Sequence, residues 1–241
     1  MTLDVAFSRH DVARRSASSR AAIVIDIIRA STTIAIALHN GCAGIIPVGE
    51  RDEARTLAAT LGGSVLLAGE RRAEKIAGFD LGNSPADFSR ERVAGKTVVL
   101  TTTNGTRAFR ALDGAREVIV CAFVNVSAVA RWLSRAGLDV MIVCAGRRGH
   151  FCLEDAVGGG MLIDRLLRVF DGAIALSDAA RASRMLYAAH QGDLLGMLRD
   201  CEWGRGLTEE GFGADLEICA QVDVIGTVPV MRDGRLVAEE A

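Results

Sequence analysis

The sequence of 241 residues is short of several features, and each shortage excludes a class of protein. Aromatic residues make up only 5% and there are 3 Pro, so we expect a core packed by Ala, Val, Leu and Ile, as where helices cover a parallel sheet. No apolar run approaches the roughly 18 residues that a membrane span needs, and the N-terminus has no apolar signal segment. We therefore expect a cytoplasmic protein with no membrane partner.

Metal-binding and redox patterns of cysteine and histidine are also missing. None of the 6 Cys forms a CxxC pair, and the 4 His contain no HExxH motif. These absences predict reduced thiols and no zinc site. The net charge is −2 and acidic and basic residues are interspersed, which disfavours nucleic acid as a partner.

Lysine is almost absent. Of the 28 basic residues, 26 are Arg, and only Lys75 and Lys96 are Lys. We attribute most of this bias to overall base composition. A single Arg in a predicted site is therefore weak evidence for function, and a Lys is somewhat stronger evidence.

Short β-branched runs alternate with helical stretches rich in Ala and Leu, a βαβ pattern. With right-handed crossovers, the pattern predicts an α/β fold: a three-layer α/β/α sandwich with a mostly parallel sheet. No Pro- or Ser-rich linker divides the chain, so we expect a single domain over residues 1–241, with a helix-rich segment at about 153–210 as a cap or outer layer. The predicted strands are 22–26, 44–48, 64–68, 97–100, 117–121, 140–144 and 224–230. The predicted helices are 30–40, 51–61, 105–112 and 126–136.

Polar and charged residues follow four of the predicted strands. In open parallel sheets, ligands bind beyond the carboxyl ends of the strands. Taken alone, each hydroxyl, and Glu154 and Asp155, is better explained as part of a helix cap or first turn, each glycine as a turn, and Asp26 and Glu70 as solvated or paired with Arg. Their convergence on one edge nevertheless favours a binding site. The stretches are DIIRASTT (26–33), GERR (69–72) with GFDLGNSP (78–85), TTTNGTR (101–107), and CAGRRGHF (144–151) followed by Glu154 and Asp155.

These residue types predict a site for a phosphorylated small molecule. Hydroxyls, backbone N–H groups and Arg suit a tetrahedral anion. Carboxylates beside an anion repel it unless a divalent cation lies between them, and oxygen ligands suit Mg²⁺. The residues therefore predict metal-assisted chemistry on a phosphorylated substrate.

The motifs of several known phosphate-binding classes are incomplete in this chain. The stretch GKT (95–97) resembles the end of a P-loop, but residue 90 is Arg and a predicted strand follows. There is no GxGxxG. At the spacing of a cysteine phosphatase, Cys144 is matched by His150 instead of Arg, and Asp26 lacks the second Asp of haloacid dehalogenases. The conventional phosphatase classes are therefore excluded.

Together the four loops resemble those of the 2-phosphosulfolactate phosphatase family, the ComB-like proteins. The matching stretches are VIDIIRASTTI (24–34), GERRAEKIAGFDLGNSP (69–85), TTTNGTRA (101–108), VCAGRRGHFCLED (143–155), and Asp223 with VPV (228–230). The resemblance covers nearly the whole chain. It implies an α/β/α hydrolase that uses Mg²⁺ to convert 2-phospho-3-sulfolactate into 3-sulfolactate and phosphate, a step toward coenzyme M.

One loop departs from the family pattern. After Glu70 the family usually carries glycines, whereas here Arg72 and Ala73 stand in the loop. We therefore expect the shape of this loop, or the fit of the leaving group, to differ in this chain.

On this basis we expect Mg²⁺ to be held by carboxylates, and a metal-activated water to attack phosphorus; a nucleophilic Asp26 that forms an aspartyl-phosphate is the alternative. The predicted metal ligands are Asp26, Glu70, Glu154 and Asp155. The predicted catalytic residues are Asp26, Arg29, Glu70, Lys75 and Arg107. The predicted substrate-binding residues are Ser31, Thr32, Asn83, Ser84, Thr102, Thr103, Asn104, Gly105, Thr106, Cys144 and Gly146.

Two other functions fit the same pattern of residues. One is a non-enzymatic anion-binding protein, and the other is a transferase or lyase that acts on a phosphorylated or sulfonated acid. Release of inorganic phosphate separates both from the phosphatase. The expected partners are the small acid and, as a homodimer, a second copy of the chain.

Overall fold

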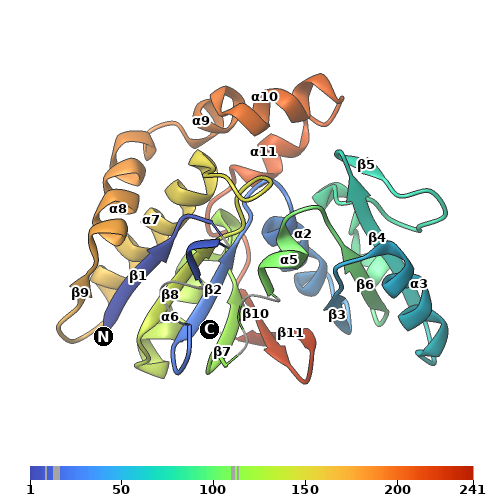
Figure 1. The fold of residues 1–241 in the computed structure, drawn as a ribbon, viewed down its shortest axis with the longest axis horizontal. Coiled ribbons are helices and arrows are strands. Elements are labelled where there is room, and N and C mark those ends of the chain that lie inside the picture. Colours follow the sequence, from blue (N-terminus) through green and yellow to red (C-terminus); the bar gives the residue numbers. More distant parts are fainter. Residues whose placement is uncertain (9, 13–16, 110–111, 113, 241) are drawn as a thin grey trace.

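A computed structural model describes residues 1–8, 10–12, 17–109, 112 and 114–240 (Figure 1). The side chains of Thr106 and Arg107 fall outside this description. The strands are β1 (Thr2–Ala6), β2 (Ala21–Ile25), β3 (Gly44–Pro47), β4 (Val65–Arg71), β5 (Glu74–Lys75), β6 (Thr97–Thr101), β7 (Glu117–Val120), β8 (Val140–Cys144), β9 (Ala175–Leu176), β10 (Thr227–Arg232) and β11 (Arg235–Glu240). The helices are α2 (Ala30–His39), α3 (Arg51–Thr60), α4 (Arg90–Val93), α5 (Gly105–Phe109), α6 (Val126–Ala136), α7 (Leu153–Val169), α8 (Asp178–His190), α9 (Leu194–Asp200), α10 (Glu202–Glu209) and α11 (Asp215–Cys219), with 3₁₀ turns η1 (Pro85–Asp87) and η2 (Phe123–Asn125).

The sheet consists of two parallel groups joined by an antiparallel hairpin. Its order is β5-β4-β6-β3-β11-β10-β7-β2-β8-β1-β9. Strands β4, β6 and β3 pair in parallel, as do β7, β2, β8, β1 and β9. Hairpin β10–β11 pairs antiparallel with β7 on one side and β3 on the other. The predicted strand at 224–230 is thus one arm of this hairpin and not a further βαβ strand.

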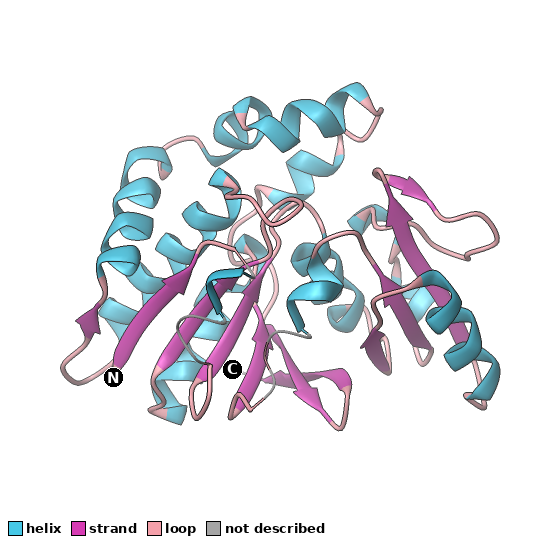
Figure 2. Ribbon diagram, in the orientation of Figure 1, coloured by secondary structure: helices cyan, strands magenta, loops and turns pink. Residues whose placement is uncertain are grey.

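Helices and loops cover both faces of the sheet, as Figure 2 shows. Alternate residues of β2 point to opposite faces: Ile23 and Ile25 pack in the same core cluster as α6 and α7, whereas Ala22 and Val24 pack with Ala108 of α5. The side chains of β6 likewise alternate: Val98 and Leu100 pack in a cluster with residues of α2, whereas Val99 packs in a cluster with Ala54 of α3. The predicted three-layer α/β/α architecture is confirmed.

The helix-rich segment forms both an outer layer and a cover. Helices α7 and α8 pack on each other beside the sheet. In the sequence, the two-residue strand β9 is the one regular element among the described residues between these two helices. Helices α9, α10 and α11, which we call the cap, lie across the end of the sheet at which β2 and β4 finish (Figure 1). No helix in the described ranges is long and apolar enough to span a bilayer.

Candidate active site

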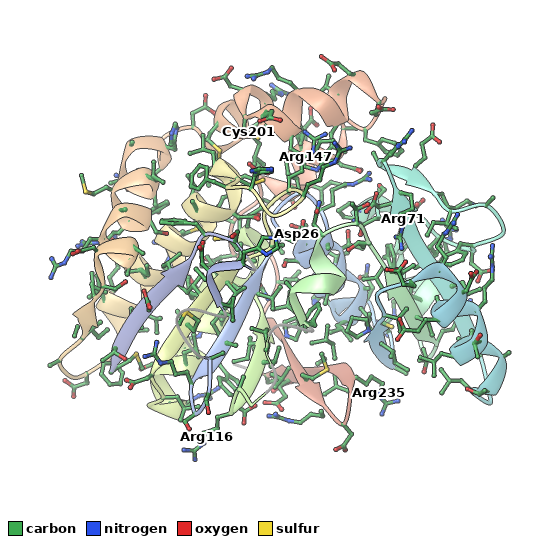
Figure 3. All side chains as sticks on the ribbon, in the orientation of Figure 1. Asp26, Arg71, Arg116, Arg147, Cys201 and Arg235 are labelled. Atoms are coloured by element: carbon green, nitrogen blue, oxygen red, sulfur yellow. The ribbon has the colours of Figure 1, made fainter. Side chains whose placement is uncertain are left out.

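A cavity of about 360 Å³ opens at the carboxyl ends of β2, β4 and β6, beneath the cap. In Figure 3, Asp26 and Arg147 lie between the sheet and α10, with Arg71 to the side on β4. A second cavity, of about 690 Å³, adjoins the first and shares Arg147, Arg148 and Trp203 with it. The first cavity is lined by Asp26, Ile28, Arg29, Glu70, Arg71, Arg72, Ala73, Asn83, Thr102, Thr103, Asn104, Arg147, Arg148, Trp203 and Glu210.

Asp26 follows the last residue of β2 and is almost completely buried. Its Oδ1 accepts the N–H of Ala30 at 3.2 Å, and its own N–H donates to Ser31 Oγ at 2.9 Å. Burial raises the pKa of Asp26 to about 7; the Ala30 N–H lowers this pKa, and the nearby Glu70 and Glu154 carboxylates raise it. The sequence thus places a carboxyl group that titrates near neutral pH at the base of the cavity.

Glu70 is the second carboxylate that lines the cavity, and it connects two strand ends. Its Oε1 accepts the N–H of Thr103 at 2.7 Å, and its Oε2 accepts the Thr103 hydroxyl at 3.2 Å and the N–H of Ala73 at 3.1 Å. These bonds hold the loop after β4 against the loop after β6. Glu70 therefore has a fixed orientation beside the cavity.

Gly105, the first residue of α5, packs closely against Asp26. A Cβ at this position would lie 2.8 Å from Asp26 Oδ2 and 2.8 Å from the Cβ of Ala30. Both distances are well inside van der Waals contact, so any side chain at this position forces the two loops apart. The contact explains why glycine occupies this position, and the role of Gly105 in substrate binding stays a prediction.

We expect Gly105→Ala to lower kcat/KM at least about tenfold and to destabilise the fold by about 1–3 kcal/mol, the usual cost of overpacking. Gly62→Ala is the matched control, because nothing lies within 4 Å of a Cβ at Gly62. Steady-state kinetics and urea unfolding of the two variants check this. Equal effects in both would show that the contact with Asp26 is irrelevant.

Arg29 connects the cavity to the cap. It is buried and pairs with Asp215 of α11 at 2.7 Å, and its second guanidinium nitrogen donates to Ala73 O at 2.9 Å. Its guanidinium lies 4.5 Å from the centre of the Phe212 ring. Asp215 also accepts the hydroxyl of Ser84 at 2.6 Å. Arg29 and Ser84 thus both bind Asp215. Nothing in the sequence indicated this role for Asp215, because the residue lies in a distant part of the chain with no recognisable motif.

Asn83 lines the cavity and carries a buried polar atom that has no partner among the described residues. The side chain is 5% exposed, and in the described part of the chain Oδ1 has no hydrogen-bond partner. Buried polar atoms are nearly always paired, so this atom is suited to a partner supplied by a ligand. The prediction of Asn83 as a substrate-binding residue is consistent with this position.

The other two predicted metal ligands, Glu154 and Asp155, do not line the first cavity, although both lie close to Asp26. Asp155 uses Oδ1 to accept the N–H of Ile27 and Oδ2 to accept the N–H of Gly146, each at about 3 Å. Asp155 thus positions the loops after β2 and β8.

Glu154 is buried and lines the second cavity. Burial raises the pKa of Glu154, whereas hydrogen bonds with the thiols of Cys152 and Cys201 lower this pKa.

Several other predicted site residues do not line the first cavity. In α2, the Ser31 hydroxyl bonds within the turn after β2 and Thr32 donates to Ile27 O. Cys144 is fully buried in the core, and Lys75 is exposed on β5. Thr106 and Arg107 belong to α5, but their predicted roles rest on side chains outside the described part.

Sequence reasoning assigned no role to several residues that line the first cavity. The arginines gave little signal because the whole chain is rich in Arg, and Trp203 and Glu210 lie in the cap, far from the strand ends. Trp203 and Glu210 were missed altogether. The other lining residues without an individual predicted role lie in or beside the stretches expected at this edge of the sheet: Ile28, Arg71, Arg72, Ala73, Arg147 and Arg148.

Comparison with known proteins gives one consistent result. The family model described as 2-phosphosulpholactate phosphatase matches residues 7–234. A protein of Caldanaerobacter subterraneus is 39% identical over 91% of each chain, one of Thermotoga maritima is 38% identical over 92% of this chain and 93% of its own, and one of Clostridium tetani is 35% identical over 97% and 99%. All three are named probable 2-phosphosulfolactate phosphatase. The resemblance of the four loops is thereby confirmed, and the chain belongs to the 2-phosphosulpholactate phosphatase family.

Proposed function

We propose that this protein is a phosphoric monoester hydrolase that converts 2-phospho-3-sulfolactate, or a closely related 2-phospho-acid, into the hydroxy acid and inorganic phosphate, and that it requires Mg²⁺. The observation that carries the proposal is the cavity itself. It places Asp26 and Glu70 at strand ends among five arginines, Arg29, Arg71, Arg72, Arg147 and Arg148, in a member of a family described by this activity.

The residues of the cavity fit a hard divalent cation held by few protein ligands. Among the described residues, no three His, Cys, Asp or Glu side chains are grouped so that they would hold a metal by themselves. Mg²⁺ is commonly bound through one or two carboxylates, with waters and substrate phosphate completing its shell. Asp26 and Glu70 would be those carboxylates, and both line the cavity. When bound, Mg²⁺ would polarise the phosphoryl oxygens and the attacking water.

The protein's own residues bind and orient the substrate in this proposal. Thr102 and Thr103 line the cavity. The N–H and hydroxyl of Thr103 donate to Glu70 and would hold that carboxylate in place beside the phosphoryl group. In the reaction, a water oxygen bonds to phosphorus, the ester P–O bond breaks, and the ester oxygen leaves as the hydroxyl of 3-sulfolactate.

A panel of 2-phospho-acids, with and without a sulfonate, tests the proposal by phosphate release. We expect release from 2-phospho-3-sulfolactate in Mg²⁺, loss of that release after EDTA, and recovery when Mg²⁺ is added back in excess. Release that is unaffected by EDTA would contradict the metal requirement. Binding of the acids with no phosphate release would contradict the hydrolase and indicate an anion-binding protein.

A further inference from the structure

The side chains of Arg72 and Arg148 differ from those of the other three arginines of the cavity, because neither has a partner among the described residues. Arg29 pairs with Asp215, and Arg147 pairs with Glu202 at 3.2 Å and stacks on Trp203 at 4.1 Å. The Arg71 guanidinium donates to Glu70 O, Gly49 O and Thr101. By contrast, the exposed Arg72 and Arg148 guanidinium groups form no ion pair or hydrogen bond with any residue in the described ranges. These two groups are available for a ligand.

The backbone at these two residues is also unusual. Arg72 has φ +55° and Arg148 has φ +52°, in the left-handed region that residues with a Cβ adopt only at a cost. Glycine would relieve this cost at both positions, yet each carries a long cationic side chain. An energetically costly backbone conformation at a cavity wall points to a functional constraint.

The bonds of the two loops explain how these conformations are held. The residue after Arg72, Ala73, also has a positive φ of +66°; its N–H donates to Glu70 and its carbonyl accepts from Arg29. The N–H of Arg148 donates to Asn104 Oδ1 at 2.9 Å. Both arginines thus project from loops that are bonded to other walls of the same cavity, which fixes the points from which their side chains extend.

From these observations we propose that Arg72 and Arg148, the arginine pair, bind the terminal sulfonate of the substrate and so determine its specificity. The inference rests on the proposed phosphatase function. The substrate carries a carboxylate and a sulfonate besides the phosphate. Asp26, Glu70 and Glu210 add negative charge to the cavity walls, so a further anion needs cations that are not already neutralised. A three-oxygen anion accepts hydrogen bonds from two guanidinium groups in different loops.

The test compares Arg72→Gly and Arg148→Gly on two substrates, 2-phospho-3-sulfolactate and 2-phospholactate, which lacks the sulfonate. Glycine suits the positive φ at both positions, so we expect these variants to fold. Each should raise KM for the sulfonated substrate about tenfold, the effect of losing one charge-assisted hydrogen bond. Values of kcat, and KM for 2-phospholactate, should stay within about twofold. Arg72→Lys should recover part of the lost affinity.

Asp233→Gly is the matched control. Asp233 has φ +49° in the turn between β10 and β11 and lines neither cavity, so this variant reports the effect of glycine alone and should behave as wild type. A KM that is unchanged in both arginine variants, or that rises equally for the two substrates, would overturn the proposal.

Calorimetric titration with 3-sulfolactate and with lactate separates this inference from the phosphatase itself, because it needs no turnover. The arginine variants should bind 3-sulfolactate about tenfold more weakly than wild type, with lactate binding unchanged. If wild type releases no phosphate but this difference is present, the phosphatase proposal fails and the arginine pair stands. If 3-sulfolactate binds wild type and both variants equally, or binds none of them, the arginine pair is wrong.

Discussion

Asp26→Asn is expected to reduce kcat/KM by about 10²–10³-fold, as for removal of one electrostatic group from an active site, and at the same time to stabilise the fold at neutral pH. The variant loses the charge that would hold a divalent cation, yet it keeps a carbonyl oxygen that accepts the Ala30 N–H. The buried negative charge, which burial and nearby carboxylates disfavour, disappears. Activity and stability should therefore change in opposite directions.

The pH dependence of stability follows from the same carboxyl group. Folding raises the pKa of Asp26 from 3.8 to about 7 because the group is buried. Between these pH values the folded protein binds the proton of Asp26 more tightly than the unfolded chain does. The stabilising contribution of the protonated Asp26 to the free energy of unfolding is therefore complete below about pH 4 and is lost as pH rises through about 7. By about pH 8 the wild type should be less stable than Asp26→Asn by about 2–4 kcal/mol.

Calorimetric unfolding without divalent cations, at several pH values, measures this difference. Asp52→Asn is the control, because the side chain of Asp52 is 92% exposed and should change neither activity nor the pH dependence. Substantial activity in Asp26→Asn, or a lower Tm than wild type at alkaline pH, would contradict this role of Asp26.

Asp215→Ala should be strongly destabilising. The change leaves the guanidinium of Arg29, which is 2% exposed, without its ion-pair partner and removes the acceptor of Ser84. Breaking a buried pair from one side costs about 3–5 kcal/mol, which corresponds to a Tm lower by about 10 °C in a chain of this size. Urea unfolding and calorimetry measure the loss, and kcat/KM should fall because the cap is no longer anchored.

Two further variants test whether the ion pair explains this loss. Asp200→Ala removes an exposed partner of Arg205 and should cost less than about 1 kcal/mol. The double variant Arg29→Met with Asp215→Leu should recover most of the stability, because it leaves no buried charge unpaired. Full stability of Asp215→Ala, or no recovery in the double variant, would show that the pair does not anchor the cap.

Buried strands and amphipathic helices were predictable from the sequence, because their patterns are local. The predicted strand 140–144 and helix 126–136 coincide with β8 and α6. Pairing between distant segments leaves no such pattern. The first predicted strand starts at residue 22, but Thr2–Ala6 already form β1 and pair with β8. The place of the β10–β11 hairpin in the middle of the sheet was not predictable either, because its pairing with β7 and β3 joins segments that are far apart in the sequence.

The site was predictable only where it lies at strand ends. Asp26, Glu70, Thr102 and Thr103 line one cavity because parallel strands bring their carboxyl ends together. The contribution of the cap was missed, since Trp203 and Asp215 carry no motif that ties them to Arg29 and Arg147. The guanidinium of Arg29, predicted as a catalytic residue, is bound to Asp215. Its catalytic role stays a prediction, and its pairing with the cap is visible only in three dimensions.

The claim that Asp26 and Glu70 hold a divalent cation beside the substrate phosphate is tested most directly by calorimetric titration of Mg²⁺ in the presence of inorganic phosphate. Wild type, Asp26→Asn and Glu70→Gln are compared, and phosphate release is measured on the same samples. We expect Mg²⁺ affinity to fall at least about tenfold in both variants, together with loss of activity. Unchanged Mg²⁺ affinity and unchanged phosphate release in both variants would contradict the claim.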